Sequence, residues 1–321
     1  MKLHHLILGL IGLVLLVAVA SLTPIHSAEA APLMPGLSVA VAPQELMPAQ
    51  AGYVYVSGGY PLQVTALLED EMLDVFWTGD GYLALYTFDF DAQPGDYVLS
   101  VQVSEPSTGA SGTYRFTLHL LAFEYPLEQV ALPYSLIPLL DPQLNAQEVE
   151  RLSAIYAVHT NPATWDWPFA LPVPGGVVTS RFGGSRIYNG GMFSAHHTGV
   201  DFRRAIGEPI QATAGGRVAV AGFFEVRGNV VIIDHGHGVF SQYAHLSEFY
   251  VQPGQSVERG QLIGAAGATG RTNGPHLHFE IIVNGIPVDP IRWLGLTPGF
   301  VPPREVVPAR NTPVQEPTGG G

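Results

Sequence analysis

The chain has no cysteine among its 321 residues, and its only lysine is Lys2. The absence of cysteine excludes disulfides, a thiolate metal site, a catalytic thiol and a lipid-bearing lipoprotein cysteine. Charged residues make up only 13% of the chain, and the formal net charge is -13. This balance offers no broad basic surface for nucleic acid or anionic lipid, so neither is expected as a partner.

Apolar residues are plentiful, at 47% of the chain, together with 37 glycines and 27 prolines. The apolar content excludes a wholly disordered chain, and the length is enough for two domains. Glycine and proline interrupt the interiors of helices and strands, so they favour short strands and turns over long helices. The composition therefore predicts an all-β protein of two domains.

Residues 1–30 have the layout of a secretory signal peptide. Lys2 supplies the positive start, residues 6–22 form an apolar run, and Ala28-Glu29-Ala30 is a small-x-small cleavage site. We predict cleavage after Ala30 and a secreted or cell-envelope protein, with no membrane segment after cleavage. An uncleaved anchor is the alternative, although the run is slightly short for a full span. Both interpretations place the remaining chain outside the cytoplasm.

Residues 31–123 are expected to form an immunoglobulin-like β-sandwich. Apolar side chains alternate in DYVLSVQVS and in TYRFTLHLL, a period of two that is typical of strands with one buried face. Turn signals separate the strands at Gly58-Gly59, Gly79-Asp80-Gly81 and Pro94-Gly95. No catalytic constellation is evident there, and the acidic side chains are interpreted as solvated: Asp70, Glu71, Asp74 and Asp89.

A short helical linker is predicted over residues 124–168. Asn145 is the expected N-cap, and Glu148 stands at the third helical position, which is the spacing of a capping box. Val149, Leu152 and Tyr156 follow at helical spacing. The helix is expected to link or brace the two domains.

Residues 169–298 form the second predicted domain, which also has the pattern of β-strands. NVVIIDHG reads as a strand entering a turn, GVFSQYAHLS as its hairpin partner, and HLHFEIIV as a further strand. Residues 299–321 are rich in proline and end in glycines, so a disordered tail is predicted there.

Histidine is concentrated in the second domain, where seven of the twelve fall between His196 and His278. In His197-Thr198-Gly199-Val200-Asp201 an imidazole and a carboxylate are four residues apart, and on an extended chain they point the same way. His276 and His278 also share one face of a strand. A catalytic zinc site uses three protein ligands and one open position for water. This set supplies three ligands and leaves one histidine for proton transfer.

Each half of this pattern is weak alone, but a specific frame of glycines and turns lies between them. In order along residues 180–290, the frame comprises SRFGGSRIYNGG, HTGVDF, GEPIQATAGGRVAVAG, GNVVIIDHGHGVFSQYAHLS and VQPGQSVERGQLIGAAGATGRTNGPHLHFEIIVNGIPVDP. This segment, about a third of the chain, resembles the lysostaphin/LytM-type zinc endopeptidases of bacterial cell walls. The resemblance implies an antiparallel β-sheet domain like the duplicated hybrid motif.

By this resemblance, His197, Asp201 and His278 correspond to the Zn²⁺ ligands. His245 and His276 correspond to two histidines that assist catalysis, and which of them is the general base is left open. The implied substrate is the peptide part of peptidoglycan, in its stems or cross-bridges. Tyr188 is a further catalytic candidate, because relatives use a tyrosine in transition-state binding, although its distance from His197 differs from theirs.

Other polar residues of this domain received competing interpretations. The His-x-Gly-x-Asp pattern selects His197 rather than His196 as the ligand. His235 and His237 lie in DHGHG and are interpreted as turn residues. Glu280 shares a face with His276 and His278, as a structural carboxylate or a base. Arg186 and Asn189 are interpreted as residues that line a groove or cap a turn.

Two other classes of function were weighed against an active endopeptidase. Some relatives lack metal ligands and only bind the wall or activate other hydrolases, but all five positions are filled here. VQPGQSVERGQLIG resembles part of a biotinyl or lipoyl carrier, yet such carriers modify a lysine and Lys2 lies in the predicted signal. The front domain is expected to bind or position the wall polymer, and any regulatory partner is unknown.

Overall fold

The computed structural model describes residues 34, 36–59, 61–161, 163, 168–296 and 304–305. The predicted signal peptide and its cleavage site lie outside the described residues, as does the predicted tail except for residues 304–305. Among the residues described, no helix is both long and apolar enough to cross a membrane.

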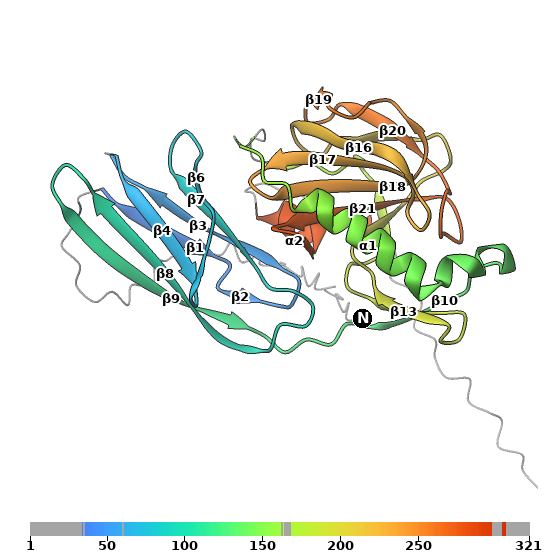
Figure 1. The fold of residues 1–321 in the computed structure, drawn as a ribbon, viewed down its shortest axis with the longest axis horizontal. Helices are drawn as coiled ribbons and strands as arrows, with labels where there is room; N and C mark the ends of the chain where they lie inside the picture. Colours follow the sequence, from blue (N-terminus) through green and yellow to red (C-terminus); the bar gives the residue numbers. More distant parts are fainter. Residues whose placement is uncertain are drawn as a thin grey trace, which may run out of the picture.

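The first half of the chain forms two antiparallel-rich sheets that share one core (Figure 1). One sheet has the order β1-β3-β7-β6, from strands Ser38–Ala42, Ala51–Ser57, Tyr82–Thr87 and Val75–Trp77. The other has the order β2-β9-β8-β4-β5, from strands Glu45–Leu46, Ala110–Leu120, Gly95–Glu105, Gln63–Leu68 and Glu71–Met72. The two-sheet packing agrees with the predicted sandwich, and its likeness to immunoglobulin domains stays a prediction.

The predicted alternation in β8 is present in the structure. Leu99, Val101 and Val103 are buried, whereas Val98 and Gln102 are exposed and Ser100 is partly buried. The buried side chains belong to the core that the two sheets share. The period of two therefore identified the inward face of this strand correctly.

The linker contains more structure than one helix. It comprises strand β10 (Leu127–Val130), the 3₁₀ helix η1 (Tyr134–Leu140) and helix α1 (Pro142–Tyr156). The predicted cap is wrong, because Asp141 caps α1 and accepts hydrogen bonds from the backbone N–H groups of Gln143 and Leu144. Proline at the next position favours this start, since it has no N–H to leave unpaired. Asn145 lies inside the first turn instead.

The predicted apolar stripe of α1 is confirmed at Leu152 and Tyr156 and is wrong at Val149. Val149 is exposed, whereas Glu148, Leu152 and Tyr156 are buried and follow each other at intervals of four. Glu148 therefore occupies the inward face of the helix and makes no capping box. A carboxylate on such a face requires a cationic partner, because burial of an unpaired charge is costly.

The second half is built on one large sheet, and most of its neighbouring strands run antiparallel. Its main path is β19-β16-β17-β18-β21-β14-β11-β23, from strands Ser256–Val257, Gly216–Phe224, Gly228–Gly236, Val239–Phe249, His276–Val283, Val200–Arg203, Val177–Ser180 and Arg304–Glu305. Joined to this path are β15 (Pro209–Gln211), β20 (Leu262–Ala266) and β22 (Ile286–Val288), and helix α2 (Pro290–Gly295) follows. A separate sheet has the order β10-β12-β13, with β12 at Ser185–Tyr188 and β13 at Phe193–His196.

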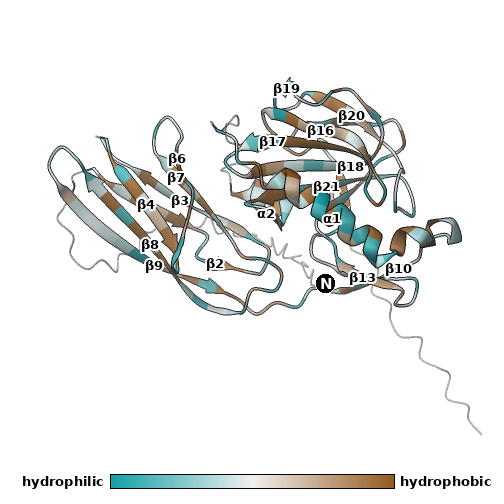
Figure 2. Cartoon of the chain, viewed as in Figure 1, coloured by the Kyte–Doolittle hydropathy of each residue, from teal (hydrophilic) through white to brown (hydrophobic). Residues whose placement is uncertain are grey.

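Both faces of the large sheet are covered, and this explains its nearly continuous apolar strands. Val231 and Ile233 of β17 face the main core, while the alternate residues Val230 and Ile232 face the side on which α1 packs. Figures 1 and 2 show α1 lying across these hydrophobic strands. Helix α1 is thus part of the second half rather than a free connector.

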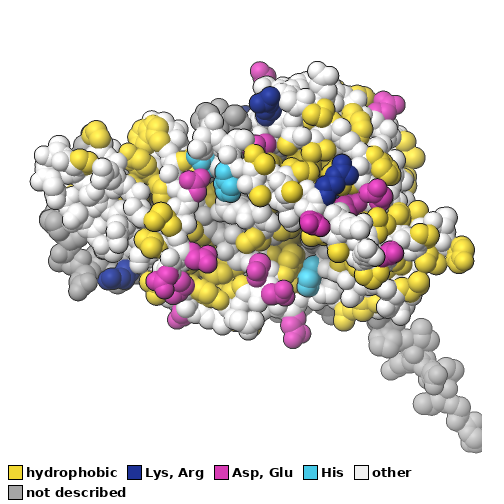
Figure 3. Space-filling model, in the orientation of Figure 1, with side chains coloured by type: hydrophobic (Ala, Val, Ile, Leu, Met, Phe, Trp, Pro, Cys, Tyr) yellow, Lys and Arg dark blue, Asp and Glu magenta, His cyan; other side chains and the backbone are white. Residues whose placement is uncertain are grey.

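The two halves of the protein pack against each other. Phe76 and Leu83 of the first half belong to the same buried cluster as the core of the large sheet. Asp74 is exposed, as predicted, but it also pairs with His237 at 2.9 Å, and the His237 ring stacks on Phe76. On the face shown in Figure 3, acidic side chains outnumber lysine and arginine, in keeping with the negative net charge.

Candidate metal centre

Three predicted ligands are brought together by the pairing of β14 with β21. Asp201 stands directly opposite His278 in that ladder, and His197 lies in the turn that leads into β14. Gly199 is required in this turn, because a Cβ atom there would collide with the His278 ring and the backbone oxygen of Phe279. The local sequence therefore lets the His197 turn approach the strand that carries His278.

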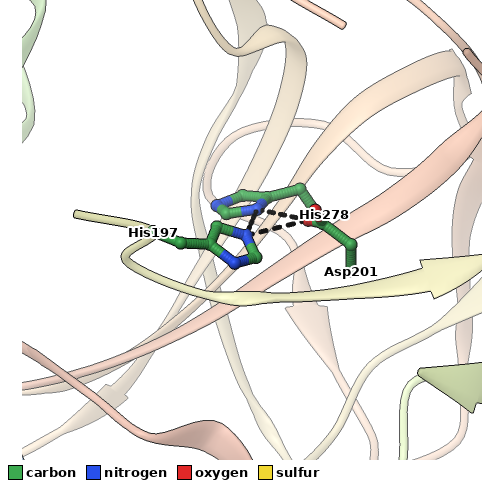
Figure 4. Close-up of side chains that lie close together, drawn as sticks. All are labelled: His197, Asp201 and His278. Carbon is green, nitrogen blue, oxygen red and sulfur yellow. Dashed lines mark hydrogen bonds and ion pairs between the residues drawn. The ribbon is translucent and has the colours of Figure 1, made fainter. Parts of the chain in front are cut away.

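The donor atoms of these side chains converge on one point (Figure 4). His197 Nε2 lies 3.0 Å from Asp201 Oδ1 and 3.1 Å from His278 Nδ1. His278 Nδ1 lies 2.8 Å from Asp201 Oδ1. All three side chains are buried, so a bound ion would be largely shielded from solvent.

A second polar atom of each ligand is held by another group. His197 Nδ1 donates to the backbone oxygen of Arg181 at 2.6 Å, and His278 Nε2 donates to Glu280 Oε1 at 2.7 Å. Asp201 Oδ2 accepts from Arg186 Nη2 at 2.6 Å. Because each histidine uses its outer nitrogen as a donor, its inner nitrogen is left with a lone pair for a metal. Two imidazoles and one carboxylate suit Zn²⁺.

Burial and neighbouring charges set the protonation of these ligands. Burial lowers the pKa of His197, which favours the neutral form that binds metals. Burial alone would raise the pKa of Asp201, but His197 and Arg186 outweigh it and keep the pKa well below its usual range. For His278, hydrogen bonds to Asp201 and Glu280 outweigh burial and raise the pKa, so a metal would compete with a proton there.

His245 and His276 stand beside the three ligands. The His245 ring centre lies 4.8 Å from that of His276 and 5.9 Å from that of His278. His245 Nδ1 donates to the backbone oxygen of Thr269 at 2.7 Å, which leaves Nε2 unprotonated in the neutral ring. His276 Nδ1 lies 2.9 Å from the backbone oxygen of Gly274, and its Nε2 lies 3.6 Å from Asp201 Oδ1.

These two histidines differ in environment. Burial, followed by the nearby His276 and His278, lowers the pKa of His245 well below its usual value. His245 is therefore neutral at ordinary pH and can accept a proton or a hydrogen bond. His276 is only partly buried. Both rings lie beside the converging side chains, and their catalytic roles stay a prediction.

Tyr188 is packed beside the centre rather than placed among the ligands. It is buried in a cluster with Leu132 and Leu140, and the Arg271 guanidinium lies 4.6 Å from the centre of its ring. The catalytic role of Tyr188 stays a prediction.

The competing interpretations of the polar neighbours are resolved by their contacts. His196 is exposed and stacks on Phe90, outside the group of converging donors. Asn189 ties the β12–β13 hairpin to the linker, since its side chain accepts from Leu132 N at 2.7 Å. Arg186 and Glu280 hold two of the ligands, so neither is merely a turn residue.

The interpretation of His235 as a turn residue is wrong, whereas His237 does lie in the turn. His235 is fully buried in β17, with Nδ1 on the backbone oxygen of Gly215 and Nε2 on Ser241 Oγ. The turn therefore starts after Gly236, later than the sequence DHGHG indicated. Burial lowers the pKa of His235 to about 4.

This buried histidine predicts an acid-sensitive fold. An unfolded chain protonates His235 near its ordinary pKa of about 6.5, while the folded chain resists protonation down to about 4. The stability contribution is complete above about pH 6.5 and is lost as the pH falls toward 4. We expect a loss of about 2 kcal/mol between about pH 7.5 and about pH 5 from this group.

Thermal unfolding of the wild type, His235→Gln and His119→Gln at those two pH values measures the effect. The decrease in melting temperature on acidification should be smaller in His235→Gln than in the wild type. The exposed His119 serves as the matched control and should leave the decrease unchanged. Equal decreases in all three proteins would contradict the assignment.

Several residues of the centre were missed by sequence reasoning. Arg227 contacts both Glu280 and Glu148, and Arg271 reaches from its loop to the linker at Leu139 and Asn145. One signal was present, because Glu148 shares the helical face of Leu152 and Tyr156. The arginines stand in ordinary turn sequences, where an exposed side chain is the usual expectation.

Two histidines and an aspartate that converge inside a β-sheet domain form a donor set that suits Zn²⁺. Residues 195–290 match peptidase family M23. The chain therefore contains a peptidase family M23 domain, and the resemblance predicted from the motifs is confirmed.

Similar proteins include enzymes and an activator. The chain is 41% identical over 115 residues to the peptidoglycan DD-endopeptidase ShyA of Vibrio cholerae, covering 36% of this chain and 27% of ShyA. It is 39% identical over 133 residues to the murein hydrolase activator NlpD of Escherichia coli, covering 41% of this chain and 31% of NlpD. The chain thus spans about a quarter to a third of the length of these relatives.

One solved structure extends the likeness beyond the matched domain. A Pseudomonas aeruginosa crystal structure assigned to peptidase M23 has a TM-score of 0.52 and is 26% identical. The alignment covers 78% of this chain and 96% of that one. The likeness therefore reaches outside residues 195–290, into residues that precede the matched domain.

Proposed function

We propose that this protein is an extracytoplasmic, zinc-dependent endopeptidase that hydrolyses peptide stems or cross-bridges of peptidoglycan. The observation that carries the proposal is the convergence of His197, Asp201 and His278 on one point, with their outer polar atoms already engaged. Relatives that act on peptidoglycan support the substrate class. The predicted signal peptide supports the compartment.

The residues around the ligands have roles that follow from their contacts. His197, Asp201 and His278 would hold Zn²⁺, which when bound supplies Lewis acidity and lowers the pKa of a water ligand to about 7. His245, fixed by its hydrogen bond to Thr269, presents Nε2 to accept or share a proton. His276, oriented by Gly274, is the second candidate for proton transfer and for stabilising negative charge on the substrate.

Digestion of purified peptidoglycan tests this proposal. We expect mass spectrometry to detect fragments with newly formed peptide amino and carboxyl ends. A chelator should abolish their release, and added Zn²⁺ should restore it, because the ligands are all protein side chains that can bind the ion again. Release that is insensitive to the chelator, or cleavage confined to glycan strands, would contradict the proposal.

NlpD favours one alternative, a non-catalytic module that binds the wall or activates another hydrolase. The complete set of donors favours the enzyme, because an activator has no need of converging metal ligands. The same digestion separates the two functions. An activator alone would release no fragments, but it would increase the release produced by a second, added wall hydrolase.

The first half of the chain is proposed to bind or position the wall polymer. Its packing against the large sheet supports a fixed position relative to the metal centre. Binding of the full chain to insoluble peptidoglycan tests this role. The wild type is compared with variants in exposed side chains of β5 and β6, such as Met72→Ser and Trp77→Ser.

A further inference from the structure

Helix α1 is connected to the metal ligand His278 by a chain of buried charges. Glu148 accepts hydrogen bonds from Val226 N at 2.7 Å and from Arg227 Nη1 at 3.2 Å. Arg227 Nη2 in turn lies 3.2 Å from Glu280 Oε1, the atom that holds His278 Nε2. The chain Glu148–Arg227–Glu280–His278 therefore runs from the linker to a ligand, and we name it the helix relay.

Strand β10 is connected to the ligand Asp201 in a similar way. Glu128 Oε2 accepts from Arg186 Nε at 3.1 Å, and Arg186 Nη2 contacts Asp201 Oδ2 at 2.6 Å. Ser180 Oγ lies between them and accepts from Arg186 Nη2 at 2.8 Å. We name the chain Glu128–Arg186–Asp201 the strand relay. The parallel pairing of β10 with β12 places Glu128 opposite Arg186.

The helix relay is largely removed from solvent, whereas the Glu128 side chain of the strand relay is 30% exposed. The exposed side-chain fractions are 2% for Glu148, 17% for Arg227 and 1% for Glu280. Each carboxylate of the two relays lies within 3.2 Å of a guanidinium group, and a buried charge is tolerated only in such a fixed, paired arrangement.

The charge balance of the two relays suits a divalent cation. Four carboxylates, those of Glu148, Glu280, Glu128 and Asp201, face two guanidinium groups. Each guanidinium group is shared by two carboxylates, so the two relays together carry a surplus of two negative charges. Ion pairs that served only to dock the linker would require no such surplus and no connection to ligand atoms.

The linker also holds the loops that flank the centre. Arg271, five residues before His276, donates to Asn145 Oδ1 at 2.7 Å and to the backbone oxygen of Leu139. Asn189 binds the backbone of Leu132. The stretch from β10 to the end of α1 therefore contacts the hairpin before His197 and the loop before His276, besides supplying both relays.

We propose that residues 127–156 are an integral part of the metal centre, in which Glu148 and Glu128 act as positioning residues for the ligands His278 and Asp201. This inference rests on the proposed zinc site. It moves the start of the functional unit from residue 169, predicted from the sequence, to the beginning of β10. It also places essential parts of the centre outside residues 195–290, which match the family.

Zinc affinity of the folded full chain tests the helix relay. Glu148→Gln keeps the shape of the side chain and removes its charge, so Arg227 loses one of its two anchors. We expect the dissociation constant for Zn²⁺, measured by competition with a chromophoric chelator, to rise roughly 10-fold, the lower end of typical outer-shell effects. Glu150→Gln, an exposed position on the same helix, is the matched control and should leave it unchanged.

A double-mutant cycle separates positioning from general destabilisation. If Glu148 acts through Glu280, the effect of Glu148→Gln on zinc affinity should largely disappear in a Glu280→Gln background. A merely structural loss would add to the effect of Glu280→Gln. Additive effects, or equal affinities of Glu148→Gln and Glu150→Gln, would overturn the helix relay.

The strand relay gives an independent test should Glu148→Gln fail to fold. Glu128→Gln is expected to weaken zinc binding roughly 10-fold, with the exposed Glu124→Gln as its control. Equal affinities in this pair would overturn the strand relay. A wild type that binds no zinc would overturn the proposed function itself, whereas a wild type that binds tightly while all relay variants equal it would overturn this inference alone.

Discussion

His278→Ala is expected to abolish both zinc retention and peptidoglycan hydrolysis. Among the residues that the structure describes, His278 Nδ1 is one of three donors at the converging point, and Asp201 Oδ1 lies 2.8 Å away on the paired strand. Alanine leaves two donors, His197 and Asp201, and two protein ligands do not hold a catalytic zinc. The loss of affinity should exceed the roughly 10–100-fold typical of an outer-shell change.

The measurement is the zinc content of the purified full chain together with fragment release from peptidoglycan. His196→Ala is the matched control, because His196 is exposed, neighbours His197 in sequence and stands outside the group of donors. It should retain both zinc and hydrolysis. Full activity in His278→Ala would remove His278 from the ligand set, and loss of zinc in His196→Ala would shift the ligand by one position.

Removing His278 also removes one hydrogen bond from each of two buried carboxylates, those of Glu280 and Asp201. Glu280 would lose the hydrogen bond from His278 and would keep those from Thr198 and Arg227. Some loss of thermal stability is therefore expected as well. Circular dichroism and the melting temperature of the variant should accompany the zinc measurement, so that loss of the ion is scored only on folded protein.

The three candidate ligands could be named from the sequence because the motifs resemble those of the lysostaphin/LytM-type endopeptidases, whereas local spacing shows only that the side chains can share a face. His276 and His278 share a face two residues apart, and His197 with Asp201 flanks a glycine that only a close approach explains. Such signals are local, so they survive without knowledge of the fold. The alternation of buried and exposed side chains in β8 could be predicted for the same reason, because it depends only on local spacing.

The relays could not be predicted, because their partners are distant in the chain. Glu148 fits a capping box by its spacing from Asn145, and only the packing of α1 on the large sheet shows that it faces Arg227, 79 residues away. The prediction for His235 failed similarly, because the glycines of DHGHG suggested a turn, but strand β17 continues through His235 to Gly236. For both Glu148 and His235, packing against residues distant in the sequence determines that the side chain is buried.

His245→Ala is expected to retain zinc and lose most turnover. His245 contacts the centre through its ring, 5.9 Å from that of His278, and it is not one of the converging donors. The hydrogen bond from Nδ1 to the backbone oxygen of Thr269 leaves Nε2 unprotonated in the neutral ring, so Nε2 can accept a proton. Removal of a positioned acid or base typically costs about 10²- to 10⁴-fold, so kcat should fall by that order with KM little changed.

The backbone at His245 decides which variant gives the cleanest result. Its φ is +61°, in the left-handed region where alanine is strained and asparagine is tolerated. His245→Asn should therefore fold at least as well as His245→Ala while lacking the imidazole. The two variants should lose turnover equally if the imidazole is what matters. Higher turnover in the asparagine variant would assign part of the loss to backbone strain.

Zinc content separates the two roles that a buried histidine could have in this centre. A folded His245→Asn protein that retains one zinc per chain but hydrolyses slowly supports proton transfer or charge stabilisation by His245. Loss of zinc from that protein would make His245 a ligand, and the set of His197, Asp201 and His278 would then be incomplete. Because His276 is only partly buried and stands 3.6 Å from Asp201, it would be the remaining histidine able to move a proton at the centre.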